Sequence, residues 1–314
     1  MIKNYFKVLR AGINTTFQDL GRKNLYHIGI PFSGAMDKRN FLIANKLVGN
    51  DYNLPVIEFA YQGPQLKYFG DKINISITGD VKFILKKKKD EIDGICYKTF
   101  TLENEDEIDI LSTNKSVYGY LAISGEVDVK YQWSSCSTNT KANIGANDGK
   151  KLELNQKINI SKINENLNHK SLKYINTKIE NIRVLKATNF DYFSQKGKDT
   201  FFEKDFKVSK LSDRMGMRLE GPKIENVVDT NIKSEGLIKG VIQVPADGNP
   251  IIMLSDHGTI GGYPKIGVVI SADYDKLVQL PPGSKIRFKE VNLSSAENLF
   301  KLYELENQNL ISQI

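Results

Sequence analysis

Ionisable and hydrogen-bonding side chains crowd around a pair of glycines in the last third of the chain. Residues 256–266 read Asp-His-Gly-Thr-Ile-Gly-Gly-Tyr-Pro-Lys-Ile, between two β-branched apolar runs at 241–244 and 268–270. Such runs are typical of strands, so the polar segment is predicted to be a loop that joins strands, where sites are commonly built. The adjacent glycines allow a positive φ or a close approach to a ligand. The alternative is a tight turn with ordinary polar residues.

These residue types suit acid–base chemistry and the stabilisation of negative charge. Asp256 and Asp37 are candidates to orient a water molecule or a proton-bearing group. Thr259 and the backbone amides of Gly261 and Gly262 are candidates to hold an oxyanion. For each residue the alternative is a structural role in a turn or a barrel. Asp256 is expected to lie on an exposed loop, facing the same cleft as Arg214, Thr259 and Tyr263.

Arginine is scarce among the many lysines, which makes its placement informative. Arg22 and Arg214 are candidates to grip a carboxylate or a phosphate, because the guanidinium group is a planar fork of donors. Structural ion pairs are the alternative. The remaining candidate substrate-binding residues are polar side chains that would fix orientation: Gln18, Glu58, Gln243 and Tyr263.

The elements that must position these residues are predicted to be mainly β, with few short helices. Strands are expected at 5–10, 56–59, 65–68, 73–77, 81–85, 98–102, 108–111 and 119–123, punctuated by Gly, Asn and Asp. A short helix is expected over 38–48, with Asp37 as its N-cap and Gly49 at its end. Regular short strands favour a barrel or a sandwich.

The length of 314 residues suggests two domains. We predict a first β domain over 1–165, a second over 180–314 and a connection at 166–179, with the first ~30 residues packing on either domain. A weak internal similarity supports a duplication. The order Met36-Asp37, Glu58 and Gly63-Pro-Gln-Leu66 parallels the order Ser212-Asp213 and Glu220-Gly-Pro-Lys-Ile224.

Composition excludes several classes of protein. The net charge of +7 comes from dispersed lysines, so nucleic-acid binding is not expected. No run approaches the length of a membrane span, and no secretory leader is visible at Met1. Cys96 and Cys136 are too few for a disulfide framework and favour the cytoplasm. Three histidines without paired spacing predict no metal site.

Six short motifs occur together and in order along the chain. They are Gln18-Asp-Leu-Gly-Arg22, Ser33-Gly-Ala-Met-Asp37, Ala44-Asn-Lys-Leu-Val-Gly-Asn50, Ser212-Asp-Arg-Met-Gly216, Ile242-Gln-Val-Pro245 and Gly261-Gly-Tyr-Pro264. From residue 8 to about residue 290 the chain resembles the allophanate hydrolase subunit 2 family, also called the KipA or biotin-dependent carboxyltransferase family, whose bacterial members include the C-subunit of the ATP-dependent 5-oxoprolinase.

The resemblance implies two cyclophilin-like β-barrel domains and a shared enzyme. Together with the KipI-like B-subunit and the A-subunit of 5-oxoprolinase, such a chain would open the small molecule 5-oxo-L-proline to L-glutamate with ATP. The chain has no Met-Lys biotin-acceptor motif and no P-loop, so neither biotin attachment nor a standard ATP cradle is expected in it. The isolated chain is therefore expected to be inactive.

The middle of the chain departs from the family pattern. Gly125-Glu126 stands where a Gly-Gly pair is usual, and Ser134-Ser-Cys-Ser-Thr138 where Gly-Ser-x-Ser-Thr is usual. These changes bear on specificity. Two other functions stay open: a carboxyltransferase acting on a urea-like amide, and a regulatory protein that binds a kinase inhibitor.

Overall fold

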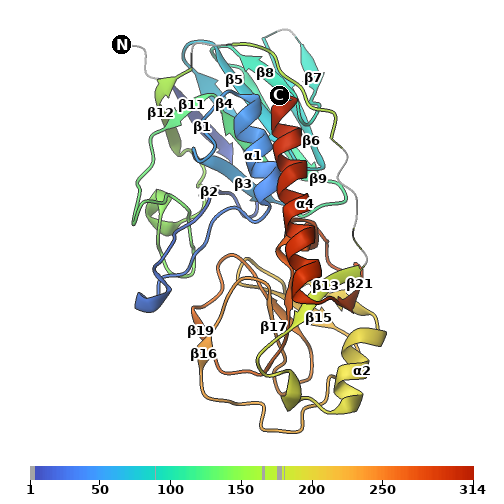
Figure 1. Cartoon of the computed structure of the whole chain (residues 1–314). Coiled ribbons are helices and arrows are strands. Elements are labelled where there is room, and N and C mark those ends of the chain that lie inside the picture. Colours follow the sequence, from blue (N-terminus) through green and yellow to red (C-terminus); the bar gives the residue numbers. More distant parts are fainter. Residues whose placement is uncertain (1–3, 89, 165–166, 175–178, 180) are drawn as a thin grey trace. The chain divides into compact units, whose positions relative to one another are not determined.

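The computed structural model of the chain describes residues 4–88, 90–164, 167–174, 179 and 181–314. They divide into two compact units, each built mainly of β-strands (Figure 1). Unit 1 comprises Met1–Arg22, Ser33–Asn176 and Asn307–Ile314, and unit 2 comprises Lys23–Phe32 and Thr177–Glu306. The predicted mainly β fold is therefore confirmed. The prediction allowed the first ~30 residues to pack on either domain, and 23–32 belong to unit 2, whereas 307–314, predicted in the second domain, belong to unit 1. Parts of the predicted connection at 166–179 lie outside the described residues.

Unit 1 contains two antiparallel sheets, and both sheets contribute apolar side chains to one hydrophobic core. The seven-stranded sheet has the order β11-β12-β1-β4-β9-β6-β7, and the five-stranded sheet has the order β2-β3-β10-β5-β8. The strands are β1 Tyr5–Arg10, β2 Thr16–Gln18, β3 Val56–Ala60, β4 Gln65–Phe69, β5 Ile73–Thr78, β6 Val81–Lys86, β7 Glu91–Asp93, β8 Thr99–Leu102, β9 Glu107–Thr113, β10 Tyr118–Ile123, β11 Gly125–Val127 and β12 Lys157–Ile163. Each of the eight strands predicted in this part of the chain is present.

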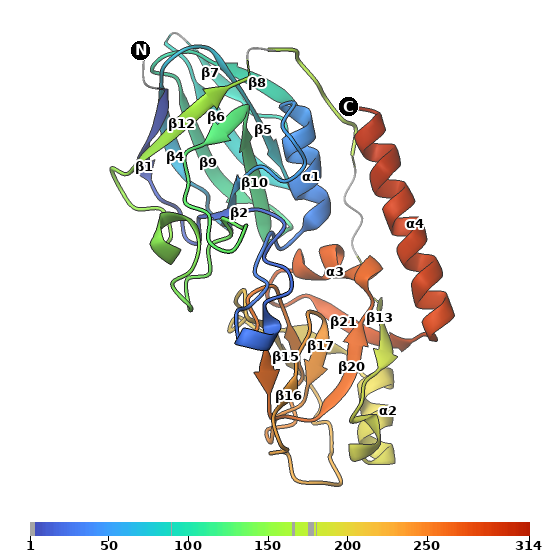
Figure 2. The same cartoon turned by 60° about the vertical axis from the view of Figure 1, so that its left-hand side comes forward.

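Helix α1, Lys38–Leu47, forms where the sequence predicted a helix (Figure 2). The Asp37 carboxylate caps its N-terminus by accepting a hydrogen bond from the Asn40 amide at 2.9 Å, and Gly49 follows its end with φ +74°. The helix packs on β5, where the Ser76 and Thr78 hydroxyls donate to backbone carbonyls of α1 at 2.8 Å. This cap role of Asp37 is confirmed.

Unit 2 is a closed seven-stranded barrel in the order β13-β20-β17-β18-β15-β14-β21. The parallel pairing of β13 with β21 closes it, whereas the other pairs are antiparallel. The barrel strands are β13 Asn181–Lys186, β14 Phe206–Val208, β15 Gly216–Glu220, β17 Val241–Gln243, β18 Ile251–Met253, β20 Lys265–Val269 and β21 Lys285–Glu290. A separate two-stranded sheet pairs β16, Glu235–Gly236, with β19, Ile260–Gly261.

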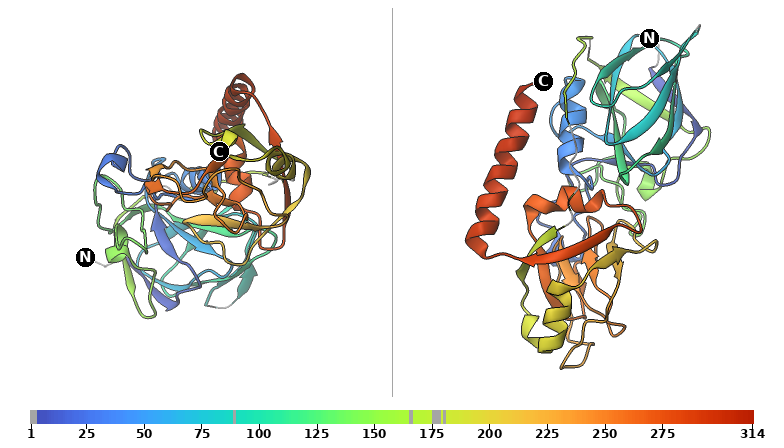
Figure 3. Two further views of the ribbon diagram at one scale, coloured as in Figure 1. Left: turned by 90° about the horizontal axis from the view of Figure 1, so that it is seen from below. Right: turned by 90° about the vertical axis from the view of Figure 1, so that its right-hand side faces the viewer.

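Helices α2 Gln195–Glu203 and α3 Ser271–Val278 belong to unit 2, with the short 3-10 turns Tyr26–Ile28 and Phe190–Tyr192. Helix α4, Leu293–Ser312, is longer than the short helices expected from the sequence. Figure 3 shows this helix along its whole length. Its last residues belong to unit 1, where Leu310 and Ile311 pack against the cluster that contains Ile43 and Leu47 of α1. No helix within the described residues is long and apolar enough to cross a membrane.

Candidate functional site

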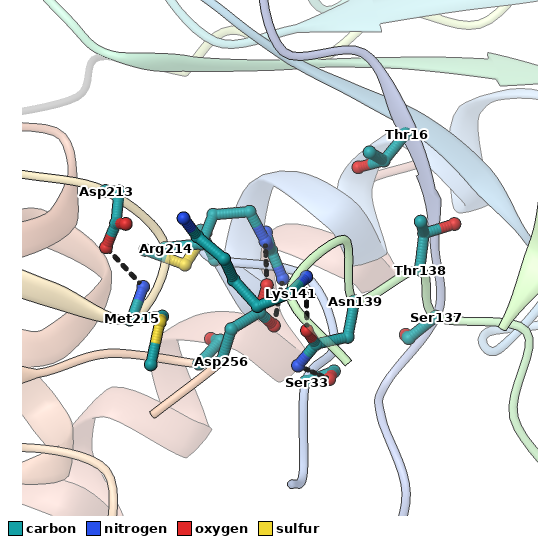
Figure 4. A network of polar contacts seen from close by, with 12 residues as sticks. Thr16, Ser33, Ser137, Thr138, Asn139, Lys141, Asp213, Arg214, Met215 and Asp256 are labelled. Atoms are coloured by element: carbon teal, nitrogen blue, oxygen red, sulfur yellow. Dashed lines mark hydrogen bonds and ion pairs between the residues drawn. The ribbon is translucent and has the colours of Figure 1, made fainter. Parts of the chain in front are cut away.

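The loop that the sequence singled out leads from β18 to β20 in unit 2, and its first charged residue is already paired. The Arg214 guanidinium group donates from Nε to Asp256 Oδ2 at 2.9 Å and from Nη2 to Asp256 Oδ1 at 3.1 Å (Figure 4). The Asp256 amide also donates to the Arg214 carbonyl oxygen at 2.9 Å. The Asp213 carboxylate shapes the neighbouring turn by accepting from the Met215 and Gly216 amides.

The expectation that Asp256 is exposed is wrong. Its side chain is 4% exposed and that of Arg214 is 14% exposed, because the two groups pack against each other. A two-point contact between a guanidinium and a carboxylate holds both planes in one orientation. The structure therefore brings together two of the predicted site residues, one proposed for acid–base chemistry and one for anion binding.

His257 follows Asp256 and is buried in unit 2 against a residue that the sequence did not single out. His257 Nδ1 lies 2.6 Å from the Gly258 carbonyl oxygen, which only accepts, so Nδ1 carries the proton in the neutral ring. Nε2 then accepts from the Tyr26 hydroxyl at 3.2 Å. Burial lowers the pKa of His257, so the neutral ring is favoured. Burial also raises the pKa of Tyr26, which keeps the phenol protonated.

The glycine pair at the far end of this loop serves close packing. Neither Gly261 nor Gly262 has a positive φ, so the left-handed conformation considered from the sequence does not occur. A Cβ on Gly261 would lie 2.8 Å from Gln243 Nε2 and 2.8 Å from a Leu237 methyl carbon. Gln243 Nε2 in turn donates to the Tyr263 carbonyl oxygen at 3.1 Å. Gln243, which is 4% exposed, thus supports the loop through a hydrogen bond to Tyr263 and close packing against Gly261.

Two further contacts join the segment around β16 to this loop and to the first residue of β20. The Thr259 carbonyl oxygen accepts from the Leu237 amide at 2.9 Å, and the buried Lys265 ammonium group pairs with Glu235 of β16. This ion pair lowers the pKa of Glu235. Thr259 is half-buried and Tyr263 is 39% exposed, so their side chains border the loop surface. These contacts hold the backbone of the loop in one conformation.

A second polar cluster, in unit 1, is centred on the buried carboxylate of Asp19. Oδ1 accepts from the Ser135 hydroxyl at 2.6 Å and the Ser137 hydroxyl at 2.5 Å, while Oδ2 accepts from the Cys136 amide at 2.8 Å. The Gly21 amide donates to Oδ1 at 2.8 Å. The two oxygens of this buried carboxylate thus accept hydrogen bonds from four donors. We call this set of contacts the Asp19 hub.

Arg22 and Gln18 flank the Asp19 hub, and both are buried. Arg22 Nη2 donates to the Ser137 carbonyl oxygen at 2.7 Å. Gln18 Nε2 donates to Thr16 Oγ1 and to the Thr138 carbonyl oxygen, each at 2.9 Å. Gln18 Oε1 has no hydrogen-bond partner among the described residues. The candidate residues of the first motif are thus joined to the segment 134–138, which departs from the family pattern.

Asp37 and Glu58 lie elsewhere in unit 1, at the start of α1. Both Asp37 oxygens bind Asn40, through its amide and its side chain, and the residue is 2% exposed. The Glu58 carboxylate accepts from the Met36 amide at 2.7 Å. Burial, with the negative charges of Glu58 and Asp37, raises the pKa of Tyr120 well above its ordinary value. This geometry gives both acids a structural role in the helix start.

The sequence missed Asp19, Ser135, Ser137, Tyr26 and the direct pairing of Arg214 with Asp256. The sequence shows many hydrogen-bonding side chains at 15–22 and at 134–140. It does not show that these two stretches contact each other. Burial raises the pKa of Cys136 well above its ordinary value, so its thiol stays protonated and is a poor nucleophile. No group of three His, Cys, Asp or Glu residues within the described part of the chain is arranged to hold a metal ion.

Comparison with known proteins assigns the family. The family described as "Carboxyltransferase domain, subdomain A and B" matches residues 28–290. The chain belongs to this carboxyltransferase family. Among curated members, it is 32% identical over 299 residues to the 5-oxoprolinase C-subunit of Escherichia coli, with 92% of each chain covered. It is 30% identical to the protein of the same name in Haemophilus influenzae, with 95% of each chain covered.

Larger members of the carboxyltransferase family contain a similar region. Urea amidolyase of Saccharomyces cerevisiae is 29% identical over 315 residues, but the chain spans only 17% of that protein. The crystal structure of Kluyveromyces lactis urea amidolyase superposes with a TM-score of 0.89 at 26% identity. It covers 99% of this chain, which spans 20% of that protein.

Proposed function

We propose that this chain belongs to an ATP-dependent 5-oxoprolinase and opens 5-oxo-L-proline to L-glutamate together with an A-subunit and a KipI-like B-subunit. One observation carries the proposal: the chain matches two proteins named as the 5-oxoprolinase C-subunit over more than nine-tenths of both lengths. Of the yeast urea amidolyase, by contrast, the chain spans only 17%. The proposal places the complex in the cytoplasm.

The ATP-dependent opening of 5-oxo-L-proline requires polar groups that are held in fixed positions. An unstrained lactam is a poor electrophile, and ATP can activate it by phosphorylating the amide oxygen. Negative charge that develops in the transition state is stabilised by cations and hydrogen-bond donors held in fixed positions. We assign the pair of Arg214 and Asp256 as the polar centre of the contribution from unit 2. The pair is preorganised by its two-point contact, and Thr259 and Tyr263, on the same loop as Asp256, remain candidate substrate contacts.

Within this assignment Arg214 presents positive charge to a carboxylate or phosphate, while Asp256 keeps its guanidinium plane in one orientation. ATP is the co-substrate of the proposed reaction. The chain shows no P-loop, so we place the nucleotide cradle on another component of the complex.

The test is reconstitution from purified subunits, with glutamate and ADP measured as products. The three-component mixture should form both from 5-oxo-L-proline and ATP, and this chain alone should form neither. Asp256→Asn in the mixture should reduce turnover, whereas the matched exposed variant Asp229→Asn should not. Full turnover by mixtures that lack this chain would refute the proposal.

The two alternatives have distinct outcomes in the same experiment. A carboxyltransferase acting on a urea-like amide would depend on a biotinylated partner, so avidin would abolish its activity. A regulatory protein would bind its partner but leave every mixture inactive toward 5-oxo-L-proline.

A further inference from the structure

A two-residue turn at the edge of the Asp19 hub has an unusual sequence. The Gln132 amide donates to the Ser135 carbonyl oxygen at 2.9 Å, and the Ser135 amide donates back to Gln132 at 3.3 Å. The two central residues, Trp133 and Ser134, have φ of 51° and 59°. Hairpin turns with a positive φ at both central positions favour Asn and Gly, because other side chains are strained there.

The Asp19 hub holds this turn in its strained form. Ser135 donates its hydroxyl proton to Asp19, and the Cys136 amide donates to the same carboxylate. At the other end, the Gln132 side-chain oxygen accepts from the Gly145 amide at 2.7 Å. A strained backbone persists only where its surroundings enforce it, and such strain concentrates at functional positions.

The turn displays aromatic side chains. Trp133 is 47% exposed and Tyr131, two residues earlier, is 49% exposed. Trp133 is the only tryptophan of the chain. Tryptophan and tyrosine are enriched at the centres of protein interfaces, where a rigid ring loses little conformational entropy on binding. The segment 128–151 that carries them has four lysines and two aspartates, so it is net positive.

We propose that this aromatic turn, Tyr131 to Ser134, is a docking surface for a partner protein whose contact region has an apolar pocket for the indole ring and an acidic rim. The inference rests on the proposed function, because the partner belongs to the same complex. The half-exposed rings favour a protein over a small ligand, since small-ligand sites enclose most of what they bind. The exposed Lys141 complements the acidic rim, while the exposed Lys130 lies 3.7 Å from the Asp148 carboxylate of the same segment.

The experiment measures binding of the purified A-subunit and the purified B-subunit to this chain, using the emission of Trp133 and calorimetry. Burial of the indole by the partner should shift its emission to shorter wavelength. Trp133→Gly should weaken binding of that partner by about 10-fold or more, since central aromatic contacts are typically of that size. The melting temperature of Trp133→Gly should not fall, because glycine accepts a positive φ without strain.

Two further variants keep the test sharp. Trp133→Phe retains an aromatic ring and should recover part of the lost affinity, whereas Tyr52→Ala, which removes an aromatic side chain that is 71% exposed, should bind like the wild type. Unchanged affinity of both Trp133 variants in a complex that assembles and turns over would overturn the docking surface and leave the proposed function standing. A wild-type chain that binds neither partner would refute both. An emission change with ATP alone and none with either partner would replace the docking surface by a nucleotide contact.

Discussion

Arg214 and Asp256 hold each other by two parallel hydrogen bonds in unit 2, with both side chains largely buried. Removing the charge of a buried partner leaves the other ion poorly compensated, which costs more than the loss of an exposed pair. The pair therefore has a structural consequence in addition to its proposed chemical one.

Replacing Asp256 by Asn should lower both stability and turnover. We expect a loss of about 1–3 kcal/mol in the free energy of unfolding, because a hydrogen bond to a charged group is lost and the Arg214 charge is left without its counterion. Turnover of the reconstituted complex should fall by about 10²-fold, because Arg214 loses the carboxylate that fixes its guanidinium plane and a misplaced group typically costs that much. Urea unfolding of the isolated chain measures the first effect, with Asp229→Asn as control. An unchanged unfolding midpoint would contradict the structural part.

The pairing of His257 with Tyr26 should make stability depend on pH. The pKa of His257 is lower in the folded protein than its ordinary value of 6.5, so the unfolded chain takes up the proton first as the pH falls. The stability contributed by the neutral ring is complete above that value and is lost as the pH drops below it. The groups that face the ring are Tyr26, Lys239 and Asp256.

The measurement is the melting temperature at pH 7.5 and pH 5.5, values chosen to lie about one unit on either side of the ordinary histidine pKa. The wild type should lose more stability over this interval than His257→Gln, which cannot take up the proton. Tyr26→Phe should itself cost about 0.5–1.5 kcal/mol, the usual size of one hydrogen bond. Parallel pH profiles for wild type and His257→Gln would refute the prediction.

Gly261→Ala should destabilise unit 2, because the added methyl group would lie 2.8 Å from atoms of Gln243 and Leu237. Gln243 cannot move away without losing its hydrogen bond to Tyr263, so a cost of about 1–3 kcal/mol is expected. Gly236→Ala is the matched control in the same two-stranded sheet, since no heavy atom lies within 4 Å of its added Cβ. Equal melting temperatures for the two variants would show that the loop can shift to accommodate the added methyl group, and would contradict the prediction.

Asp19→Asn should loosen the Asp19 hub. The substituted amide nitrogen cannot accept hydrogen bonds, so at least one of the Ser135, Ser137, Cys136 and Gly21 donors loses its acceptor. We expect a cost of about 1–3 kcal/mol for each donor left without a partner. The emission of Trp133 should change as well, because the hub holds its turn. Asp51→Asn, at an exposed position, is the control. A destabilised variant with unaltered Trp133 emission would show that the Asp19 hub does not hold the turn.

Local sequence patterns determined much of the fold. The strands of the first unit alternate or concentrate β-branched residues, and helix α1 has an N-cap at Asp37 and a glycine after its end. These signals depend on neighbours along the chain, so they can be read without the structure. Helix α4, by contrast, carries asparagine and glutamine among its apolar residues, and the packing of Leu310 and Ile311 depends on a cluster formed by residues far away in the sequence.

The candidate site depended on tertiary structure. The sequence identified the stretches that carry Asp19, Arg214 and Asp256, because their residue types and turn-forming neighbours are local features. It could not show that Arg214 meets Asp256 across 42 positions, or that Ser135 and Ser137 converge on Asp19 from more than a hundred positions away. Strand pairing and barrel closure decide such contacts. Burial then decides whether a carboxylate is an exposed reactive group or one half of a fixed pair.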